Sequence, residues 1–138
     1  MHSAVFNMVT KLNTNERISE DEVFVMMDCK ADDVMEMDNP KVWKEEMENL
    51  LETLKKELPN TELTKDWKEN YILRLSMKDV KNKIYRLEKN VTDNYGYMFV
   101  LESNLLFSKW EWFNYLLTKY AEDDEVEFVV LQFFDYHF

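Results

Sequence analysis

The stretch VEFVVLQFF, residues 126–134, is apolar at nearly every position, odd and even alike. Successive side chains of a strand point to opposite faces of a sheet, so a strand of this composition must be covered on both faces. The stretch therefore predicts a central strand with other elements packed on each side of it.

Acidic residues crowd the start of this predicted strand. Blocks of like charge repel one another and stay solvated, and a charged turn discourages aggregation at a sheet edge. One interpretation is therefore a solvated turn that leads from a helix into the strand. The alternative is a binding surface, because dense carboxylates attract a basic partner. The acids are Glu122, Asp123, Asp124, Glu125 and Glu127.

Three other segments are strand candidates. YILRLSM, residues 71–77, alternates so that every second residue is apolar and lies on one face. YGYMFVLES, residues 95–103, is rich in aromatic and branched residues and follows a turn predicted at residues 93–96. Residues 4–12 form the third candidate.

The segment DEVFVMMDC, residues 21–29, fits two structures. Ser19 and Glu22 have the spacing of a capping box, which would open a helix. Branched and aromatic residues cluster in the same segment, and these residues favour a strand. We predict a strand here and keep the helix as the alternative.

Three helices are expected. The clearest runs from Pro40 to Leu58, because Asp38 or Asn39 can cap it and Pro40 suits the first helical position. Pro59 then ends it. A capping box at Ser76 opens a second helix over 78–89, and another at Ser108 opens a third over 109–121. The first helix carries an apolar stripe at helical spacing: Trp43, Met47, Leu50, Leu51, Leu54 and Leu58.

The third helix carries two tryptophans with different expected environments. Trp110 falls on the apolar stripe of the helix, and Trp112 is turned ~200° away from it, so we expect Trp112 to be partly exposed. Tyr115 lies close to the same side as Trp112. Because Trp and Tyr dominate protein–protein hot spots, we predict that Trp112 and Tyr115 are apolar anchors for a partner.

These segments mix helices with strands without regular alternation, which predicts an α+β fold. We expect a mixed or antiparallel sheet of about four to five strands with about three helices. No segment of low complexity marks a domain boundary, so residues 1–138 are expected to form a single globular domain.

The chain has 138 residues and a net charge of −11. This charge argues against direct binding to nucleic acid or to an anionic membrane, because both need a basic surface. The apolar runs are far shorter than the ~20 residues that a membrane helix needs. Residues 1–12 lack the pattern of a signal peptide, so we expect a cytoplasmic protein.

The charge is unevenly distributed along the chain. Residues 1–38 carry nine acids and three bases, residues 39–92 carry ten acids and twelve bases, and residues 93–138 carry nine acids and two bases. The two ends are therefore acidic and the middle is nearly neutral. If the ends meet in the fold, their acids form one strongly negative surface. The N-terminal contributors are Glu20, Asp21, Glu22, Asp32 and Asp33.

Few residues offer catalytic chemistry. Gly96 is the only glycine, so a glycine-rich phosphate loop is excluded and we expect no nucleotide cofactor. His2 and His137 stand next to the chain ends, where fraying makes them poor general bases, although neighbouring first and last strands would bring them together. Cys29 is the only cysteine, which excludes an internal disulfide and a cysteine-based zinc site.

Clustered carboxylates leave a divalent-metal hydrolase as an alternative class. One cluster comprises Asp32, Asp33, Glu36 and Asp38, and the other comprises Glu122, Asp123, Asp124, Glu125 and Glu127. Neither has the glycine-turned spacing of a calcium loop. We therefore expect no bound metal and no enzymatic activity.

In size and composition, the chain resembles small acidic inhibitors that phages and mobile elements encode. These include anti-CRISPR proteins, other nucleic-acid mimics and immunity proteins against nuclease toxins. The resemblance covers no motif, and no site residue follows from it. It implies an anti-defence role and a basic protein as partner.

The physical logic of such an inhibitor needs only charge and a fold. A DNA-binding cleft is basic, and a folded protein with closely spaced carboxylates can be steered into it and occupy it. We therefore predict a non-enzymatic inhibitor of a nucleic-acid-processing enzyme, such as a nuclease. A structural or interaction domain, including a homodimer, is the alternative.

Overall fold

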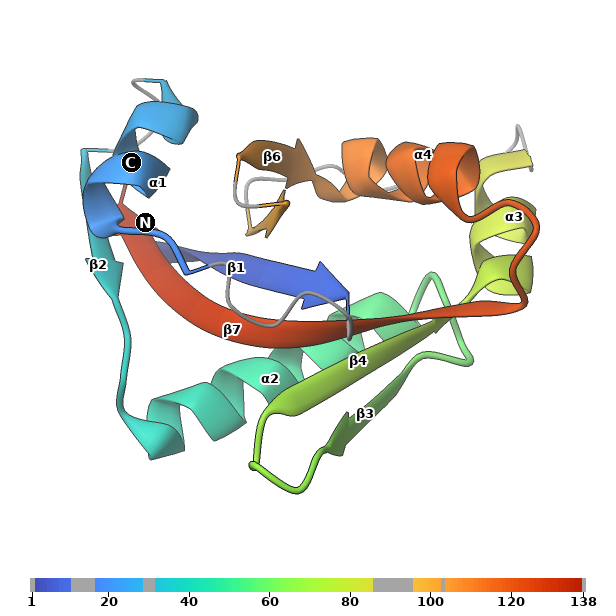
Figure 1. Ribbon diagram of the computed structural model, residues 1–138, viewed down its shortest axis with the longest axis horizontal. Helices are drawn as coiled ribbons and strands as arrows, with labels where there is room; N and C mark the ends of the chain where they lie inside the picture. Colours follow the sequence, from blue (N-terminus) through green and yellow to red (C-terminus); the bar gives the residue numbers. More distant parts are fainter. Residues whose placement is uncertain (1, 11–16, 29–31, 86–95, 103, 138) are drawn as a thin grey trace.

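The computed structural model describes residues 2–10, 17–28, 32–85, 96–102 and 104–137 (Figure 1). Within these residues, four helices and seven strands form an α+β fold with one mixed sheet. The predicted fold class is confirmed, and the helices and the strands are both more numerous than predicted. In chain order they are β1 (His2–Thr10), α1 (Glu20–Met27), β2 (Asp33–Glu36), α2 (Pro40–Lys55), β3 (Glu62–Lys65), β4 (Tyr71–Ser76), α3 (Met77–Tyr85), β5 (Tyr97–Leu101), β6 (Leu105–Ser108), α4 (Lys109–Lys119) and β7 (Glu125–His137).

The predicted central strand is β7, which runs as a long curved ribbon through the middle of the molecule (Figure 1). The sheet has the order β3-β4-β7-β1-β5-β6, and β2 also pairs with β7. On one side β7 pairs with β1 along most of its length. On the other side it pairs first with β4, at residues 125–130, and then with β2, at residues 134–137. Only the β1–β5 pair is parallel among the described strands.

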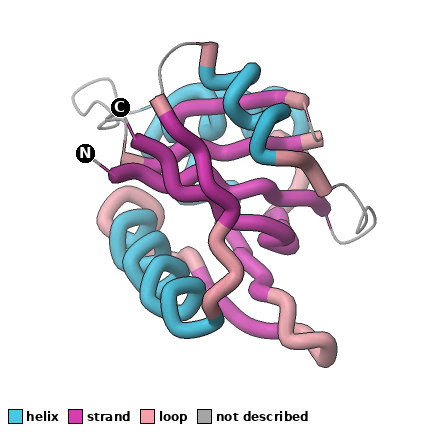
Figure 2. The backbone as a smooth tube through the Cα atoms, turned by 90° about the vertical axis from the view of Figure 1, so that its left-hand side faces the viewer, coloured by secondary structure: helices cyan, strands magenta, loops and turns pink. Residues whose placement is uncertain are grey.

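Both faces of β7 are covered, as its sequence predicted. Phe128 and Val130 belong to the large core under α2, α3 and α4, whereas Phe134 and Tyr136 pack with α1 on the other face. Figure 2 shows the strands lying between α2 and α1. A register shift against β1 leaves Leu131 as the extra residue of a β-bulge.

The three predicted helices are confirmed, with small differences at their ends. α2 ends at Lys55, before the predicted Leu58, although Leu58 is still buried in the core. α3 begins at Met77, and residues 86–89 of its predicted range lie outside the described part of the chain. α4 has the predicted capping box at Ser108 with both of its hydrogen bonds. Residues 93–95 of the predicted turn also lie outside the described residues.

The predicted strand over residues 21–29 is wrong, since this segment is the helix α1. The Ser19 side chain accepts from the backbone N–H of Glu22, and the Glu22 carboxylate accepts from the backbone N–H of Ser19. Val23 and Met27 then lie one turn apart and are both buried. The capping box therefore outweighed the β-propensity of the branched residues.

Candidate functional site: acidic groups at the two ends of β7

The predicted acids form two separate groups. The N-terminal acidic group comprises Glu20, Asp21, Glu22, Asp32 and Asp33, and the C-terminal acidic group comprises Glu122, Asp123, Asp124, Glu125 and Glu127. Asp33 pairs with His137 at one end of β7, and Glu125 is the first residue at the other end. A straight strand of this length would span about 40 Å.

The two ends of the chain do meet, but their acids do not merge into one surface. His2 pairs with His137 across β1 and β7, and the two chain ends lie side by side (Figures 1 and 2). The antiparallel pairing places the acidic groups at opposite ends of β7. The expected single negative surface is therefore replaced by two, separated by the length of the strand.

The turn between α4 and β7 holds the most exposed part of the C-terminal acidic group. Glu122, Asp123 and Asp124 are all exposed, as a solvated turn requires. The Asp123 N–H donates to the carbonyl of Tyr120 at 3.0 Å, and the Asp124 carbonyl accepts from Met77 N–H at 2.9 Å. The backbone of the turn is thus fixed while its carboxylates face solvent.

Glu125 and Glu127 have a basic neighbour in Arg74 of β4. The guanidinium lies 3.8 Å from the Glu125 carboxylate and 3.2 Å from the Glu127 carboxylate, and it also reaches Glu62 at 3.1 Å. The charge of Glu125, then that of Glu127, raises the pKa of Arg74 above its ordinary value. Three carboxylates share one guanidinium, so this part of the surface stays negative.

A groove of about 560 Å³ runs beside the C-terminal acidic group, between α4 and the ends of β1 and β5. Asp123, Glu125 and Glu127 line one side of it. On the other side, Lys119 forms an ion pair with Glu102, which lowers the pKa of the Glu102 carboxyl. The groove is therefore predominantly acidic, with one lysine already paired.

Tyr115 lies in this groove and is half-buried. Its hydroxyl donates to Glu102 Oε1 at 2.9 Å and accepts from Lys119 Nζ at 3.0 Å. Its ring also packs on Phe107, with the ring centroids 4.9 Å apart. Tyr115 therefore presents only part of its ring to a partner.

The expected exposure of Trp112 is wrong. Trp112 is fully buried and stacks on Phe99 with the ring centroids 4.1 Å apart. Trp110, which was assigned to the core stripe, is instead exposed at the surface. α4 is apolar on more than one side, and the sheet selects the side formed by Trp112, Phe113 and Leu116. Trp112 is core and cannot serve as a surface anchor in this fold.

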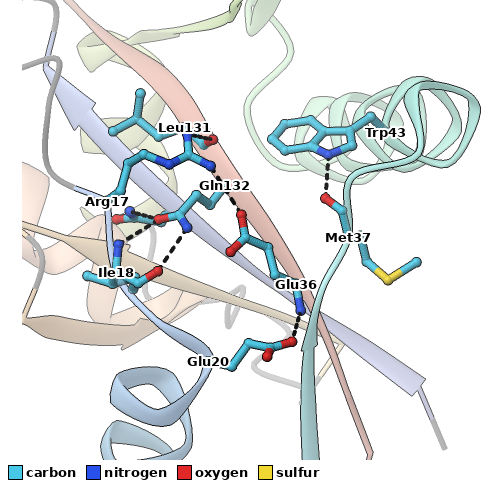
Figure 3. Close-up of polar contacts among 9 residues, drawn as sticks. Arg17, Ile18, Glu20, Glu36, Met37, Trp43, Leu131 and Gln132 are labelled. Carbon is cyan, nitrogen blue, oxygen red and sulfur yellow. Dashed lines mark hydrogen bonds and ion pairs between the residues drawn. The ribbon is translucent and has the colours of Figure 1, made fainter.

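Two members of the N-terminal acidic group have roles inside the fold. Glu22 completes the cap of α1. A Glu20 carboxylate oxygen accepts from the backbone N–H of Glu36 at 2.7 Å and so ties α1 to β2 (Figure 3). Asp21, Asp32 and Asp33 are exposed. The group therefore mixes acids that hold the structure with acids that face solvent.

A buried amide holds the segment that leads into α1. The Gln132 side chain accepts from Ile18 N–H at 2.7 Å and donates to the Ile18 carbonyl at 2.8 Å (Figure 3). Asn7 Nδ2 also donates to Gln132 Oε1, at 2.8 Å. Sequence reasoning missed this contact, although a single glutamine inside the apolar run of residues 126–134 was its signal.

Apolar side chains are exposed beside the N-terminal acidic group. Phe24 and Val25 of α1 are exposed, Val25 by 75%, and Met35 of β2 is 54% exposed. Phe24 and Val25 lie on one side of α1 with Asp21 before them and Asp28 after them, at helical spacing. The sequence analysis did not identify these residues, because a strand was predicted there.

The alternative metal chemistry gains no support from the geometry. Among the described residues, no three His, Cys, Asp or Glu side chains lie close enough together to hold a metal ion. Asp32, Asp33, Glu36 and Asp38 are strung along β2 and its flanks. His137 Nε2 lies 3.5 Å from Asp135 Oδ2. Cys29 and the side chain of His2 lie outside the described part.

No family model, curated protein or solved structure matches this chain. Within the described residues, no helix has the length and apolar character needed to cross a membrane.

Proposed function

We propose that this protein is a non-enzymatic inhibitor that occupies the basic surface of a nucleic-acid-binding protein or nuclease. A phage or mobile element would use it for anti-defence, in the manner of a DNA mimic or an anti-CRISPR protein. The observation that carries the proposal is that the fold places two groups of carboxylates at the two ends of one strand, on an ordered backbone.

Carboxylates on an ordered backbone suit this role for an energetic reason. A protein that binds DNA neutralises a line of phosphates with lysine and arginine. A rigid acidic surface offers the same cleft a comparable set of negative charges, and long-range attraction steers the two proteins together. The backbone of Asp123 and Asp124 is hydrogen-bonded to Tyr120 and Met77, so binding needs no ordering of the backbone there.

The N-terminal acidic group is the stronger candidate for the principal contact. Interface centres combine desolvated apolar side chains with charged surroundings. Phe24 and Val25 supply exposed apolar area on α1 beside Asp21, and Met35 supplies it beside Asp33 on the face of β2 that points away from α1. The C-terminal acidic group has less exposed apolar area beside it, because Trp112 is buried and Tyr115 is half-buried.

The separation of the groups supports contact with a duplex-binding channel. β7, which joins the two groups, would span about 40 Å if it were straight, and its curvature shortens it. One turn of B-DNA measures about 34–36 Å. A channel that binds one turn of duplex is therefore long enough to contact both groups.

Three variants with equal changes in net charge test the proposal. The first neutralises the N-terminal acidic group by Asp21→Asn, Asp32→Asn and Asp33→Asn. The second neutralises the turn by Glu122→Gln, Asp123→Asn and Asp124→Asn. The control neutralises three exposed acids of α2 by Glu45→Gln, Glu48→Gln and Glu52→Gln. Each variant removes three negative charges.

The measurement is a pull-down from nuclease-treated bacterial lysate at about 0.1 M and about 0.5 M salt, with mass spectrometry of the bound proteins. We expect the wild type and the α2 control to capture a basic nucleic-acid-binding protein at low salt and to lose it at high salt. The first two variants should capture less. Equal capture by all four proteins would contradict a role for the acidic groups.

A further inference from the structure

Trp67 is the most exposed large apolar side chain among the described residues, at 87%. It stands at the tip of the hairpin that joins β3 to β4, far from either acidic group in the sequence. Leaving an indole in water forgoes the free energy that its burial would supply. Such a residue at a hairpin tip is a candidate anchor for a binding partner.

Hydrogen bonds within the hairpin hold the backbone around Trp67 in place. Asp66 Oδ1 accepts from the backbone N–H groups of Lys68 and Asn70, each at 2.9 Å. Its backbone N–H donates to the Asn70 carbonyl at 3.0 Å, and Glu69 closes the loop in a left-handed conformation with φ 63°. Because the backbone is already ordered, only the indole side chain loses conformational entropy when it binds.

A hollow of about 270 Å³ lies beside this hairpin. Trp43 and Tyr71 form its aromatic wall, with nearly parallel rings whose centroids are 6.1 Å apart. Asp38 and Glu69 supply two carboxylates to its lining, and Lys65 supplies one ammonium group, 4.8 Å from the centroid of the Tyr71 ring, so the lining has a net negative charge. The hollow therefore suits an aromatic group that carries a positive charge with it.

Trp67 is an aromatic group with a positive charge beside it. The ammonium group of Lys68 lies 4.9 Å from the centroid of the Trp67 ring, so the pair presents an indole together with a cation. We propose that two copies of this chain associate through a two-fold contact, in which Trp67 of each copy enters the hollow of the other. Lys68 would then approach Asp38 and Glu69 of the second copy.

The positions of the indole and the hollow fit two-fold symmetry. A two-fold interface uses the same patch on both copies, so a protruding group and the pocket that receives it must belong to one patch. Trp67 is two residues from Glu69 and four from Tyr71, which both line the hollow. None of the residues in this contact belongs to either acidic group, so the inference is independent of the proposed function.

Charge also selects this surface for contact between copies. A chain with a net charge of −11 repels a second copy over most of its surface. The hairpin and the hollow are closer to neutral, because Lys65 and Lys68 stand among Asp38, Asp66 and Glu69. Two copies can therefore approach at this hairpin without bringing their acidic ends together.

Sedimentation velocity over a range of concentrations tests the inference. We expect the wild type to form a dimer at micromolar concentration and Trp67→Ala to weaken it at least about 30-fold, as the loss of a hot-spot tryptophan does. Tyr85→Ala is the matched control, because Tyr85 is 70% exposed on α3, and it should leave the dimer unchanged. Circular dichroism should show the same fold for all three proteins.

A pair of charge reversals sharpens the test. Lys68→Glu and Asp38→Lys should each weaken the dimer, and the double variant should regain part of the lost affinity, because the new glutamate and lysine attract each other. A wild type that is monomeric at every concentration would overturn the inference. A Trp67→Ala variant that dimerises as strongly as the wild type would also overturn it. The same holds if Trp67→Ala keeps the dimer and loses only its binding to the captured target protein.

Discussion

At one end of β7, Glu20 and Glu22 accept hydrogen bonds from backbone N–H groups, whereas at the other end the acids of residues 122–124 project from an exposed turn. Each group contains a run of consecutive acids in the sequence, residues 20–22 and residues 122–125. The fold uses the first group partly for its own stability and leaves the turn acids in solvent. Density of charge therefore does not reveal whether an acid is structural, and substitutions should separate the two groups.

The largest expected effect concerns the anchor of the N-terminal acidic group. Gln132→Ala leaves the buried amide of Asn7 and the backbone polar groups of Ile18 without their partner and opens a cavity. We expect a loss of about 2–4 kcal/mol in the free energy of unfolding, measured by urea denaturation. Asn114→Ala, which removes an amide on the surface of α4, should cost less than about 0.5 kcal/mol. Equal losses would mean that Gln132 does not anchor α1.

The cap of α1 should give the next largest effect. Ser19→Ala removes one bond of the capping box and should cost about 1 kcal/mol in thermal unfolding experiments. Ser108→Ala in the matching cap of α4 should cost a similar amount. A negligible cost at Ser19 beside a normal cost at Ser108 would show that α1 and its acids are only loosely ordered.

A third effect should depend on pH. Burial, the largest cause, raises the pKa of Glu46 above its ordinary value of 4.5, and the charges of Glu45 and Asp135 raise it further. Protonated Glu46 therefore contributes its full stabilisation below about pH 4.5. This contribution is lost as the pH rises through the pKa of Glu46 in the folded state.

Glu46→Gln keeps a neutral group at every pH, so it should raise the free energy of unfolding at pH 7 by roughly 0.5 kcal/mol, since the site is partly solvated. The gain should vanish near pH 4 in denaturation experiments at both pH values. A gain that is the same at both values would contradict the assigned cause.

The smallest effect on stability is expected in the exposed turn. Glu122→Gln, Asp123→Asn and Asp124→Asn together should change the free energy of unfolding by less than about 0.5 kcal/mol, because these side chains are solvated. Thermal unfolding at low salt measures it. A loss above 1 kcal/mol would give the turn acids a structural role and remove the contrast with the N-terminal acidic group.

Local patterns predicted the parts of the fold that depend on local chemistry. The two-sided apolar run identified β7, and Pro40 and Ser108 marked the starts of α2 and α4. The strands β2, β3 and β6 were missed because each has only four residues, too few for alternation to be recognised. The burial of Trp112 depends on which side of an all-round apolar α4 meets the sheet, and only tertiary packing decides that.

The arrangement of the candidate site depended on topology and could not be read from the chain. The acidic N- and C-terminal regions are far apart in sequence, and nothing local specifies that β1 and β2 both pair with β7 in antiparallel register. That register separates the two acidic groups. The identity of the ten acids was visible in the sequence, but their division into two surfaces, and the neighbouring Phe24, Val25 and Met35, came only from the fold.

The central claim, that the acids occupy a basic nucleic-acid-binding surface, is tested most directly by competition. A fluorescently labelled DNA duplex is first bound to the target protein captured in the pull-down. The fluorescence anisotropy of the duplex is then followed as the acidic protein is added. We expect the anisotropy to fall to the value of the free duplex, and we expect neutralisation of Asp21, Asp32 and Asp33 to shift the titration to at least tenfold higher concentration. An anisotropy that stays constant or rises would contradict the claim, because the duplex and the acidic protein would then bind at different surfaces.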